Sequence, residues 1–144
     1  GSLLQTTVGR LEGLVPSERI MVLTADALVS AVEQQLEGTR VAVFGEPCRR
    51  DTGPCIGLAA LMMQTADPEA VMAVFPADHL ISPVDGFRDA LRAGAETIRR
   101  FPQSLVTYGI QPTYPAERFG YIERGEPLVE PGLPERCFRV RQFC

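Results

Sequence analysis

The residues best suited to chemistry in this sequence follow an apolar run that ends in a carboxylate and the single histidine. The run Val71–Leu80 reads VMAVFPADHL, and Val71–Phe75 has the apolar, β-rich character of a buried strand. Asp78 and His79 come just after that strand. Open α/β sheets bind ligands outside the carboxyl ends of their strands, so this carboxylate is well placed for chemistry. The structural alternative is a turn in which Asp78 caps the next helix.

A second candidate is the polar loop GEPCRRDTGP at residues 45–54, which contains two arginines and precedes a helix rich in small residues. That helix is predicted over Cys55–Gln64. A helix N-terminus offers unpaired backbone N–H groups and the positive end of the helix dipole, which is typical of an anion site. The alternative is that Asp51 or Thr52 caps the helix and that Pro54 lies in its first turn. The two interpretations are compatible.

The composition is that of one acidic domain. The chain has 144 residues, of which 45% are apolar, a net charge of −4 and a pI of about 5.0. This charge argues against a nucleic-acid partner, because phosphate binding requires a basic face. No apolar run is long enough to cross a bilayer, and the first residues lack the pattern of a signal peptide. We therefore expect no membrane association.

The types of the basic residues and the spacing of the cysteines argue against lysine-dependent catalysis and against a zinc site. All 14 basic residues are arginines, so no step can rely on a lysine within this sequence. The four cysteines form no Cys-x-x-Cys pair and accompany one histidine, which argues against a zinc site. Scattered thiols in an acidic chain indicate reduced cysteines and a cytoplasmic protein.

Strand and helix patterns alternate along most of the chain and position these candidates. The predicted order is helix Ser2–Leu14, strand Arg19–Thr24, helix Ala27–Glu37 capped by Asp26, strand Arg40–Phe44, helix Cys55–Gln64, strand Val71–Phe75, helix Pro83–Arg100 and strand Ser104–Ile110. Shorter β pieces follow at Gly120–Ile122, Leu128–Val129 and Cys137–Phe143. The alternation predicts an α/β fold with a mostly parallel sheet flanked by helices and a β-rich C-terminal portion. We expect one domain over residues 1–144 that is incomplete at both ends.

Three motifs, in order and at matching spacing, resemble those of mannose-1-phosphate guanylyltransferases. The first motif, E-P-x-x-R-N-T-A-P-x-I, is matched by Glu46-Pro47, Arg50, Thr52, Pro54 and Ile56. The second, P-A-D-H, is matched by Pro76-Ala77-Asp78-His79, and Thr107–Ile122 is similar to the third, T-F-G-I-x-P-T-x-P-x-T-G-Y-G-Y-I. The resemblance implies a Rossmann-like nucleotidyltransferase fold of the GT-A type. It also implies an enzyme that forms GDP-mannose and pyrophosphate from GTP and mannose 1-phosphate.

The resemblance assigns roles to individual residues. It makes Asp78 the catalytic residue and the ligand of Mg²⁺ or another divalent cation, with His79 orienting the loop. It places Gly120 and Tyr121 beside the sugar, although Tyr121 would also suit an ordinary strand aromatic. The nucleotide-binding residues that it implies are Glu46, Pro47, Arg50, Asp51, Thr52 and Pro54. Arg50 either fixes its loop or faces a phosphate, and a homo-oligomer is possible.

The sequence also departs from the family pattern. Asp51 stands where the family has Asn, and a carboxylate cannot donate the hydrogen bonds that an amide can. Glu117–Gly120 replaces T-G-Y-G, and the glycine-rich G-G-x-G-T-R-L-W-P-L loop and a later E-K-P are absent. We expect a strand from outside this sequence between Arg19–Thr24 and Val71–Phe75. The alternatives are a non-catalytic regulatory or sugar-nucleotide-binding domain, or a pyrophosphorylase that uses another nucleotide.

Overall fold

The computed structural model describes residues 1–48, 50–134 and 136–144 and divides into two compact units, Gly1–Arg88 and Asp89–Cys144. The division falls inside helix α4, Val84–Arg100. The expectation of one domain over residues 1–144 stays a prediction.

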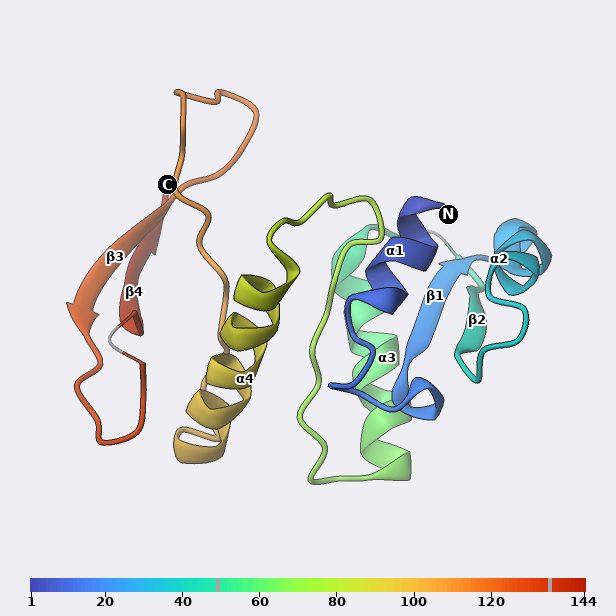
Figure 1. The fold of residues 1–144 in the computed structure, drawn as a ribbon, viewed down its shortest axis with the longest axis horizontal. Helices are drawn as coiled ribbons and strands as arrows, with labels where there is room; N and C mark the ends of the chain where they lie inside the picture. The colour runs from blue at the N-terminus through green and yellow to red at the C-terminus, as the bar shows by residue number, and fades with distance from the viewer. Residues whose placement is uncertain (49, 135) are drawn as a thin grey trace. The chain divides into compact units, whose positions relative to one another are not determined.

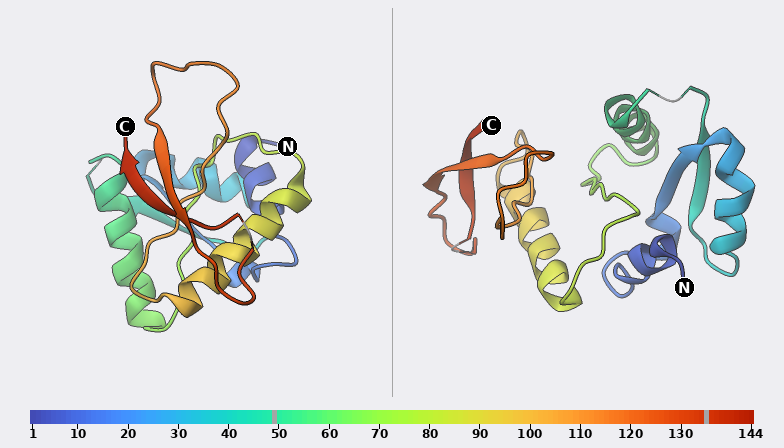
Figure 2. Two further views of the ribbon diagram at one scale, coloured as in Figure 1. Left: turned by 90° about the vertical axis from the view of Figure 1, so that its left-hand side faces the viewer. Right: turned by 90° about the horizontal axis from the view of Figure 1, so that it is seen from above.

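A β-α-β element forms the centre of the first unit (Figure 1). Strand β1, Met21–Ala25, pairs in parallel with β2, Ala42–Glu46, so that Ala25 lies opposite Glu46. The connection contains the 3-10 turn η2, Asp26–Leu28, and helix α2, Val29–Gln35. Figure 2 shows α2 on one side of the strand pair and α1 and α3 on the other. The parallel pair covered by helices confirms the predicted α/β class.

The helices of the first unit differ from their predicted limits. The predicted helix Ser2–Leu14 is shorter, because α1 spans Leu3–Gly9 and tighter turns follow up to Gly13, whose φ is 77°. Ser2 and Gln5 form a capping box at its start. Helix α3 is longer than predicted and spans Thr52–Ala66. A short 3-10 turn, η1, Ser17–Arg19, precedes β1.

Two predicted strands are not strands in this structure. Residues 71–76 and 104–110 are irregular, and the described sheets contain only the pairs β1–β2 and β3–β4. A strand exists only where a neighbour completes its ladder of backbone hydrogen bonds, and no described residues provide one here. Val71 and Val74 are accordingly exposed. β1 does not pair with residues 71–75, and the strand expected between the two segments stays a prediction.

The second unit contains the remainder of α4 and an antiparallel hairpin. Strand β3, Ile122–Pro127, pairs with β4, Phe138–Phe143, with register shifts after Glu123 and Arg124. The predicted piece Cys137–Phe143 is confirmed, whereas the piece expected at 128–129 lies just after β3. The β-rich C-terminal portion is therefore present, and its first strand begins at Ile122, the last residue of the piece predicted at Gly120–Ile122.

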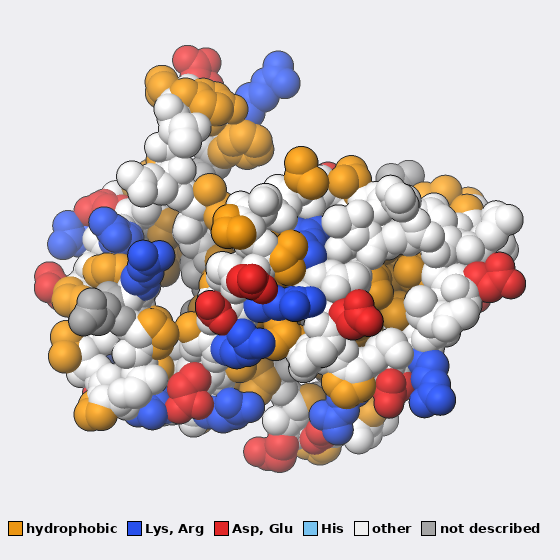
Figure 3. Space-filling model, in the orientation of Figure 1, with side chains coloured by type: hydrophobic (Ala, Val, Ile, Leu, Met, Phe, Trp, Pro, Cys, Tyr) orange, Lys and Arg blue, Asp and Glu red, His pale blue; other side chains and the backbone are white. Residues whose placement is uncertain are grey.

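Charges on the surface are mixed. On the face drawn in Figure 3, arginine side chains lie among acidic ones, as expected for a net charge of −4. Among the described residues, no helix is long and apolar enough to cross a membrane. The buried apolar core comprises Leu11 and Leu36, both in the first unit, and the buried polar residues are Arg10 and Thr97.

Candidate functional site

The turn that carries Asp78 lies at the end of the extended segment 71–76. Ala77 and Asp78 form the turn, and both side chains are exposed. Among the described residues, no ion pair engages the Asp78 carboxylate. The carboxylate is therefore open to a ligand, and the alternative that it caps a helix is not observed, since α4 begins at Val84. We call residues 76–79 the Asp78 turn.

Two side chains, one on α1 and one on the residue that follows it, donate hydrogen bonds to the backbone of the Asp78 turn. Thr7 Oγ1 donates to the carbonyl oxygen of Ala77 at 3.4 Å, and Arg10 Nη2 donates to that of His79 at 2.8 Å. The structure thus holds His79 through its backbone carbonyl, while its imidazole is exposed. The two bonds hold carbonyls on both sides of Asp78.

The Glu46–Pro54 loop connects the carboxyl end of β2 to α3. Glu46 is the last residue of β2, and Pro47 begins a bend. The predicted loop residue Arg49 lies outside the described residues, while Arg50 is exposed. Thr52 begins α3, which places Pro54 in the first turn of the helix. The loop therefore brings polar side chains to the N-terminus of a 15-residue helix.

Asp51 occupies the N-cap position of α3 in an unusual conformation. Its side chain makes no capping hydrogen bond, which corrects the interpretation of this residue as a side-chain cap. Its φ of 60° and ψ of −168° are values that glycine adopts far more readily than aspartate. The first N–H groups of α3 therefore receive no capping hydrogen bond from Asp51, and N–H groups at the start of a helix are the kind of donors that bind an anion.

Cys55, in the first turn of α3, faces Glu46 at the end of β2. Burial raises the pKa of the Cys55 thiol, and the hydrogen bond and negative charge of Glu46 raise it further. The thiol is thus kept protonated and is not an activated nucleophile. The contact also shows that the two ends of the Glu46–Pro54 loop lie close together.

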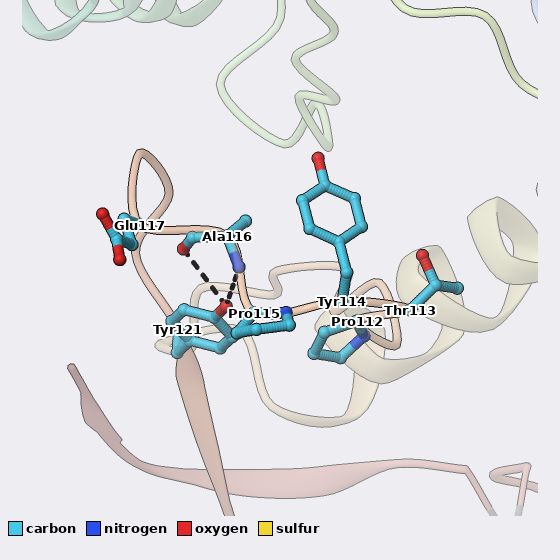
Figure 4. A pocket seen from close by; sticks show the side chains of 7 residues that line it. All are labelled: Pro112, Thr113, Tyr114, Pro115, Ala116, Glu117 and Tyr121. Carbon is cyan, nitrogen blue, oxygen red and sulfur yellow. Dashed lines mark hydrogen bonds between the residues drawn. The ribbon is translucent and has the colours of Figure 1, made fainter.

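The candidate sugar residues belong to the second unit. Tyr121 Oη accepts a hydrogen bond from the Ala116 N–H at 2.7 Å and donates one to the Ala116 carbonyl at 3.1 Å (Figure 4). Its hydroxyl is thus engaged by its own loop, which we call the 112–121 loop. A Cβ added at Gly120 would meet the Cys144 carbonyl at an ordinary 3.6 Å, so no close packing within the chain requires glycine here.

The 112–121 loop borders an open hollow of about 630 Å³. Figure 4 shows Tyr114 standing apart from Tyr121 across this hollow. Figure 3 shows hydrophobic side chains gathered on the loop, and Tyr114 and Phe119 are exposed. The residues that line it are Pro112, Thr113, Tyr114, Pro115, Ala116, Glu117 and Tyr121. The lining is mostly apolar, with two tyrosines, one threonine and one glutamate as its polar side chains, and such a surface suits a small ligand that has both apolar and polar faces.

The donor set suits one kind of metal ion. Among the described residues, no group of three or more His, Cys, Asp or Glu side chains lies close enough to hold a metal. A closed zinc or calcium cage is therefore not formed by these residues. Mg²⁺ instead binds through one or two carboxylates together with substrate phosphates and water. A single open carboxylate at Asp78 fits that mode.

Sequence reasoning missed Thr7, Arg10 and Arg88 as part of this site. Arg88 donates to the carbonyl oxygens of Arg10 and Glu12, at 3.0 and 2.9 Å. A signal was present for Arg10, because it lies between Val8 and Leu11 on the apolar side of the predicted first helix. An arginine at a core-facing position needs a specific partner.

Comparison with known proteins identifies relatives over the whole chain. The family model described as "Nucleotidyl transferase" matches residues 1–144. The chain is 36% identical to the mannose-1-phosphate guanylyltransferase ManC of Salmonella typhimurium over 147 aligned residues, which are 99% of this chain and 30% of that protein. It is equally similar, with the same coverage, to the mannose-1-phosphate guanylyltransferase of Escherichia coli K12.

A solved structure is similar as well. The crystal structure of a protein from Thermus thermophilus, named there a mannose-1-phosphate geranyltransferase, superposes with a TM-score of 0.81 and 28% identity. The match covers 98% of this chain and 39% of that one. This chain thus spans about a third of the length of its relatives.

Proposed function

The chain belongs to the nucleotidyl transferase family, and from this premise we propose that it carries part of the active site of a mannose-1-phosphate guanylyltransferase. In the proposed reaction, a phosphate oxygen of mannose 1-phosphate attacks the α-phosphorus of GTP. The bond from that phosphorus to the bridging oxygen breaks, and pyrophosphate leaves with the electron pair. The products are GDP-mannose and pyrophosphate.

The observation that carries this proposal is the open Asp78 carboxylate on a turn whose flanking carbonyls are both held. Transfer of a nucleotidyl group requires little covalent work from the protein. It requires two anions to be held in line and the developing negative charge to be offset. A carboxylate on a restrained turn, with no ion-pair partner among the described residues, suits the binding of a phosphate-associated metal ion.

Metal binding and nucleotide binding would be carried out by different residues. Asp78 would hold Mg²⁺, which supplies positive charge next to the phosphates when it is bound. The N–H groups at the start of α3 and the exposed Arg50 guanidinium would face the nucleotide, with Glu46, Pro47, Thr52 and Pro54 shaping the loop. Asp51 can accept but not donate hydrogen bonds, so it would pair with the donor edge of guanine or with ribose hydroxyls.

The 112–121 loop would receive the sugar. Tyr121 would act by holding the backbone at Ala116, because its hydroxyl is already bonded there. Gly120 would leave the backbone next to the sugar uncovered. The four cysteines are free thiols in the structure, which supports the proposed cytoplasmic location.

The experiment is a product assay on the full-length gene product that contains this sequence. The protein is incubated with Mg²⁺, mannose 1-phosphate and either GTP, ATP or dTTP, and the nucleotide sugars are separated by chromatography. We expect GDP-mannose and pyrophosphate in equal amounts, with GTP preferred. A preference for ATP or dTTP would indicate a different pyrophosphorylase. Nucleotide-sugar binding without turnover would indicate a regulatory domain.

A further inference from the structure

Arg10 is a buried cation without an acidic partner among the described residues. Only 3% of its surface is exposed. The described ion pairs all involve other residues. Arginine is rarely buried unless it is paired, because removing its charge from water is costly. An apolar side chain would fill the same space at lower cost, so the guanidinium must be held by other contacts.

The hydrogen bonds of Arg10 lead to the Asp78 turn. Nε donates to the Thr6 carbonyl at 3.4 Å, while Nη2 donates both to Thr7 Oγ1 and, at 2.8 Å, to the His79 carbonyl. Thr7 Oγ1 in turn donates to the Ala77 carbonyl. The network therefore starts on α1 and ends on the two carbonyls that bracket Asp78, across 69 and 70 positions of sequence.

Arg10 is itself fixed by the start of α4. Its guanidinium carbon lies 5.6 Å from the ring centre of Phe87, a cation–π distance. Phe75, which precedes the Asp78 turn, packs edge-on against the same ring at 5.5 Å. Arg88 holds the carbonyl of Arg10 from the other side. Side chain and backbone of Arg10 are thus both restrained.

We infer that Arg10 and Thr7 are positioning residues that set the direction of the Asp78 carboxylate toward a divalent cation. This inference rests on the proposed function. The carboxylate of an exposed aspartate on a turn changes direction when the backbone that carries it moves. The held Ala77 carbonyl belongs to the peptide group before Asp78 and the held His79 carbonyl to the peptide group after His79, so the two hydrogen bonds restrain the backbone on both sides of Asp78. Mg²⁺ demands near-ideal octahedral geometry, so a misdirected carboxylate would bind it weakly. Groups that orient metal ligands in this way commonly affect metal affinity as well as activity.

The test uses Mn²⁺ as a spectroscopic substitute for Mg²⁺ and the full-length gene product. Electron paramagnetic resonance measures free Mn²⁺ in the presence of GTP, and the Mg²⁺ dependence of GDP-mannose formation is measured in parallel. The variants are Arg10→Gln, Arg10→Lys and Thr7→Val. The matched control is Arg100→Gln, because Arg100 also donates to a backbone carbonyl, that of Pro131, in the second unit.

We expect Arg10→Gln to raise the Mn²⁺ dissociation constant about 10- to 100-fold, the range for groups that orient a metal ligand. Arg10→Lys should recover part of this loss, because one ammonium can reach the His79 carbonyl but cannot reproduce the fork. Thr7→Val, which keeps the shape of the side chain, should raise the constant roughly threefold by removing one hydrogen bond. Arg100→Gln should leave it unchanged.

The outcomes separate this inference from the proposed function. Folded Arg10→Gln and Thr7→Val proteins that bind Mn²⁺ like the Arg100→Gln control would overturn the inference, and GDP-mannose formation by the unmodified protein would still support the function. If Arg10→Gln fails to fold, the Mn²⁺ dissociation constants of Thr7→Val and Arg10→Lys are compared with that of the Arg100→Gln control instead. Values equal to the control would overturn the inference. Arg10-dependent Mn²⁺ binding without GDP-mannose formation would uphold the inference and refute the function. Absence of Mn²⁺ binding by the unmodified protein would overturn the inference.

Discussion

The Asp78 turn and the 112–121 loop are held in different ways. Thr7 and Arg10 reach the Asp78 turn from 70 and 69 positions away in the sequence. Tyr121 holds the 112–121 loop at Ala116, five positions away. The first turn therefore depends on the packing of α1 against the rest of its unit, whereas the shape of the second depends on contacts within the loop.

This difference matches the tasks proposed for the two regions. A metal ligand must keep one direction, because a small displacement of a reacting group lowers the rate steeply. A sugar-binding loop tolerates more adjustment, because several hydroxyls and ring contacts share the recognition.

The largest effect is expected from Asp78→Asn, which keeps the shape of the side chain and removes its charge. GDP-mannose formation by the full-length gene product at saturating Mg²⁺ should fall about 10²- to 10³-fold, as when one preorganised transition-state stabiliser is lost. Circular dichroism should be unchanged, because Asp78 is exposed. An unchanged rate would remove Asp78 from the mechanism.

One glycine in each unit is closely packed against a neighbouring residue: Gly45 in the first unit and Gly94 in the second. A Cβ at Gly45 would lie 2.6 Å from Asp26 Oδ1 and 3.1 Å from the Asp26 Cα, and a Cβ at Gly94 would clash with Tyr108 Oη. Alanine at either position should destabilise its unit by about 1–3 kcal/mol, the usual cost of overpacking. Thermal unfolding measures both effects.

A second substitution at the neighbouring residue tests whether that residue causes the loss of stability at each glycine. Tyr108→Phe removes the atom nearest to the new methyl group and should restore part of the stability of Gly94→Ala. Asp26→Ala should rescue Gly45→Ala less well. Asp26 Cα would remain 3.1 Å from the new Cβ and is backbone, whereas the ring atom Cζ that remains 3.1 Å away at residue 108 belongs to a side chain that can shift. Equal rescue at both sites would contradict the described packing.

A smaller effect is expected at Asp51, whose positive φ is costly for a residue with a side chain. Asp51→Gly should relieve strain of about 1–2 kcal/mol, partly offset by the greater entropy of glycine in the unfolded chain. Urea unfolding should therefore show a modest gain in stability, while Asp51→Ala should show none. A clear loss of stability in Asp51→Gly would show that the carboxylate makes a contact that stabilises the loop.

The smallest effect concerns the thiol next to the Glu46–Pro54 loop. Burial and Glu46 raise the pKa of the Cys55 thiol. The reactive thiolate is therefore scarce at pH 8, and it becomes abundant only at a pH above the usual pKa of a cysteine. Alkylation by iodoacetamide, followed by mass spectrometry, should be slower at Cys55 than at the exposed Cys144. Glu46→Gln should speed the reaction at Cys55. Rapid alkylation of Cys55 at pH 7 in the unmodified protein would contradict this environment.

The sequence predicted the helices and the parallel pair because their signals are local. The apolar spacing of Val84–Arg100 and the strand–helix–strand order from β1 to β2 need no knowledge of the rest of the chain. The strand predicted at Val71–Phe75 failed for a non-local reason, since apolar character does not provide a hydrogen-bonding neighbour. Similarly, the place of Asp78 after an apolar run makes it a candidate from local sequence alone, but the hydrogen bond of Arg10 to the His79 carbonyl depends on tertiary packing.

The central claim is that Asp78 is held for a metal ion and that the 112–121 loop is held for a sugar. The most direct measurement titrates Mg²⁺ and mannose 1-phosphate separately in GDP-mannose formation by Thr7→Val and Tyr121→Phe variants of the full-length gene product. Loss of a hydrogen bond should shift each midpoint roughly 2- to 10-fold. Thr7→Val should shift only the Mg²⁺ curve, and Tyr121→Phe should shift only the mannose 1-phosphate curve. Shifts of both curves by both variants would contradict the account.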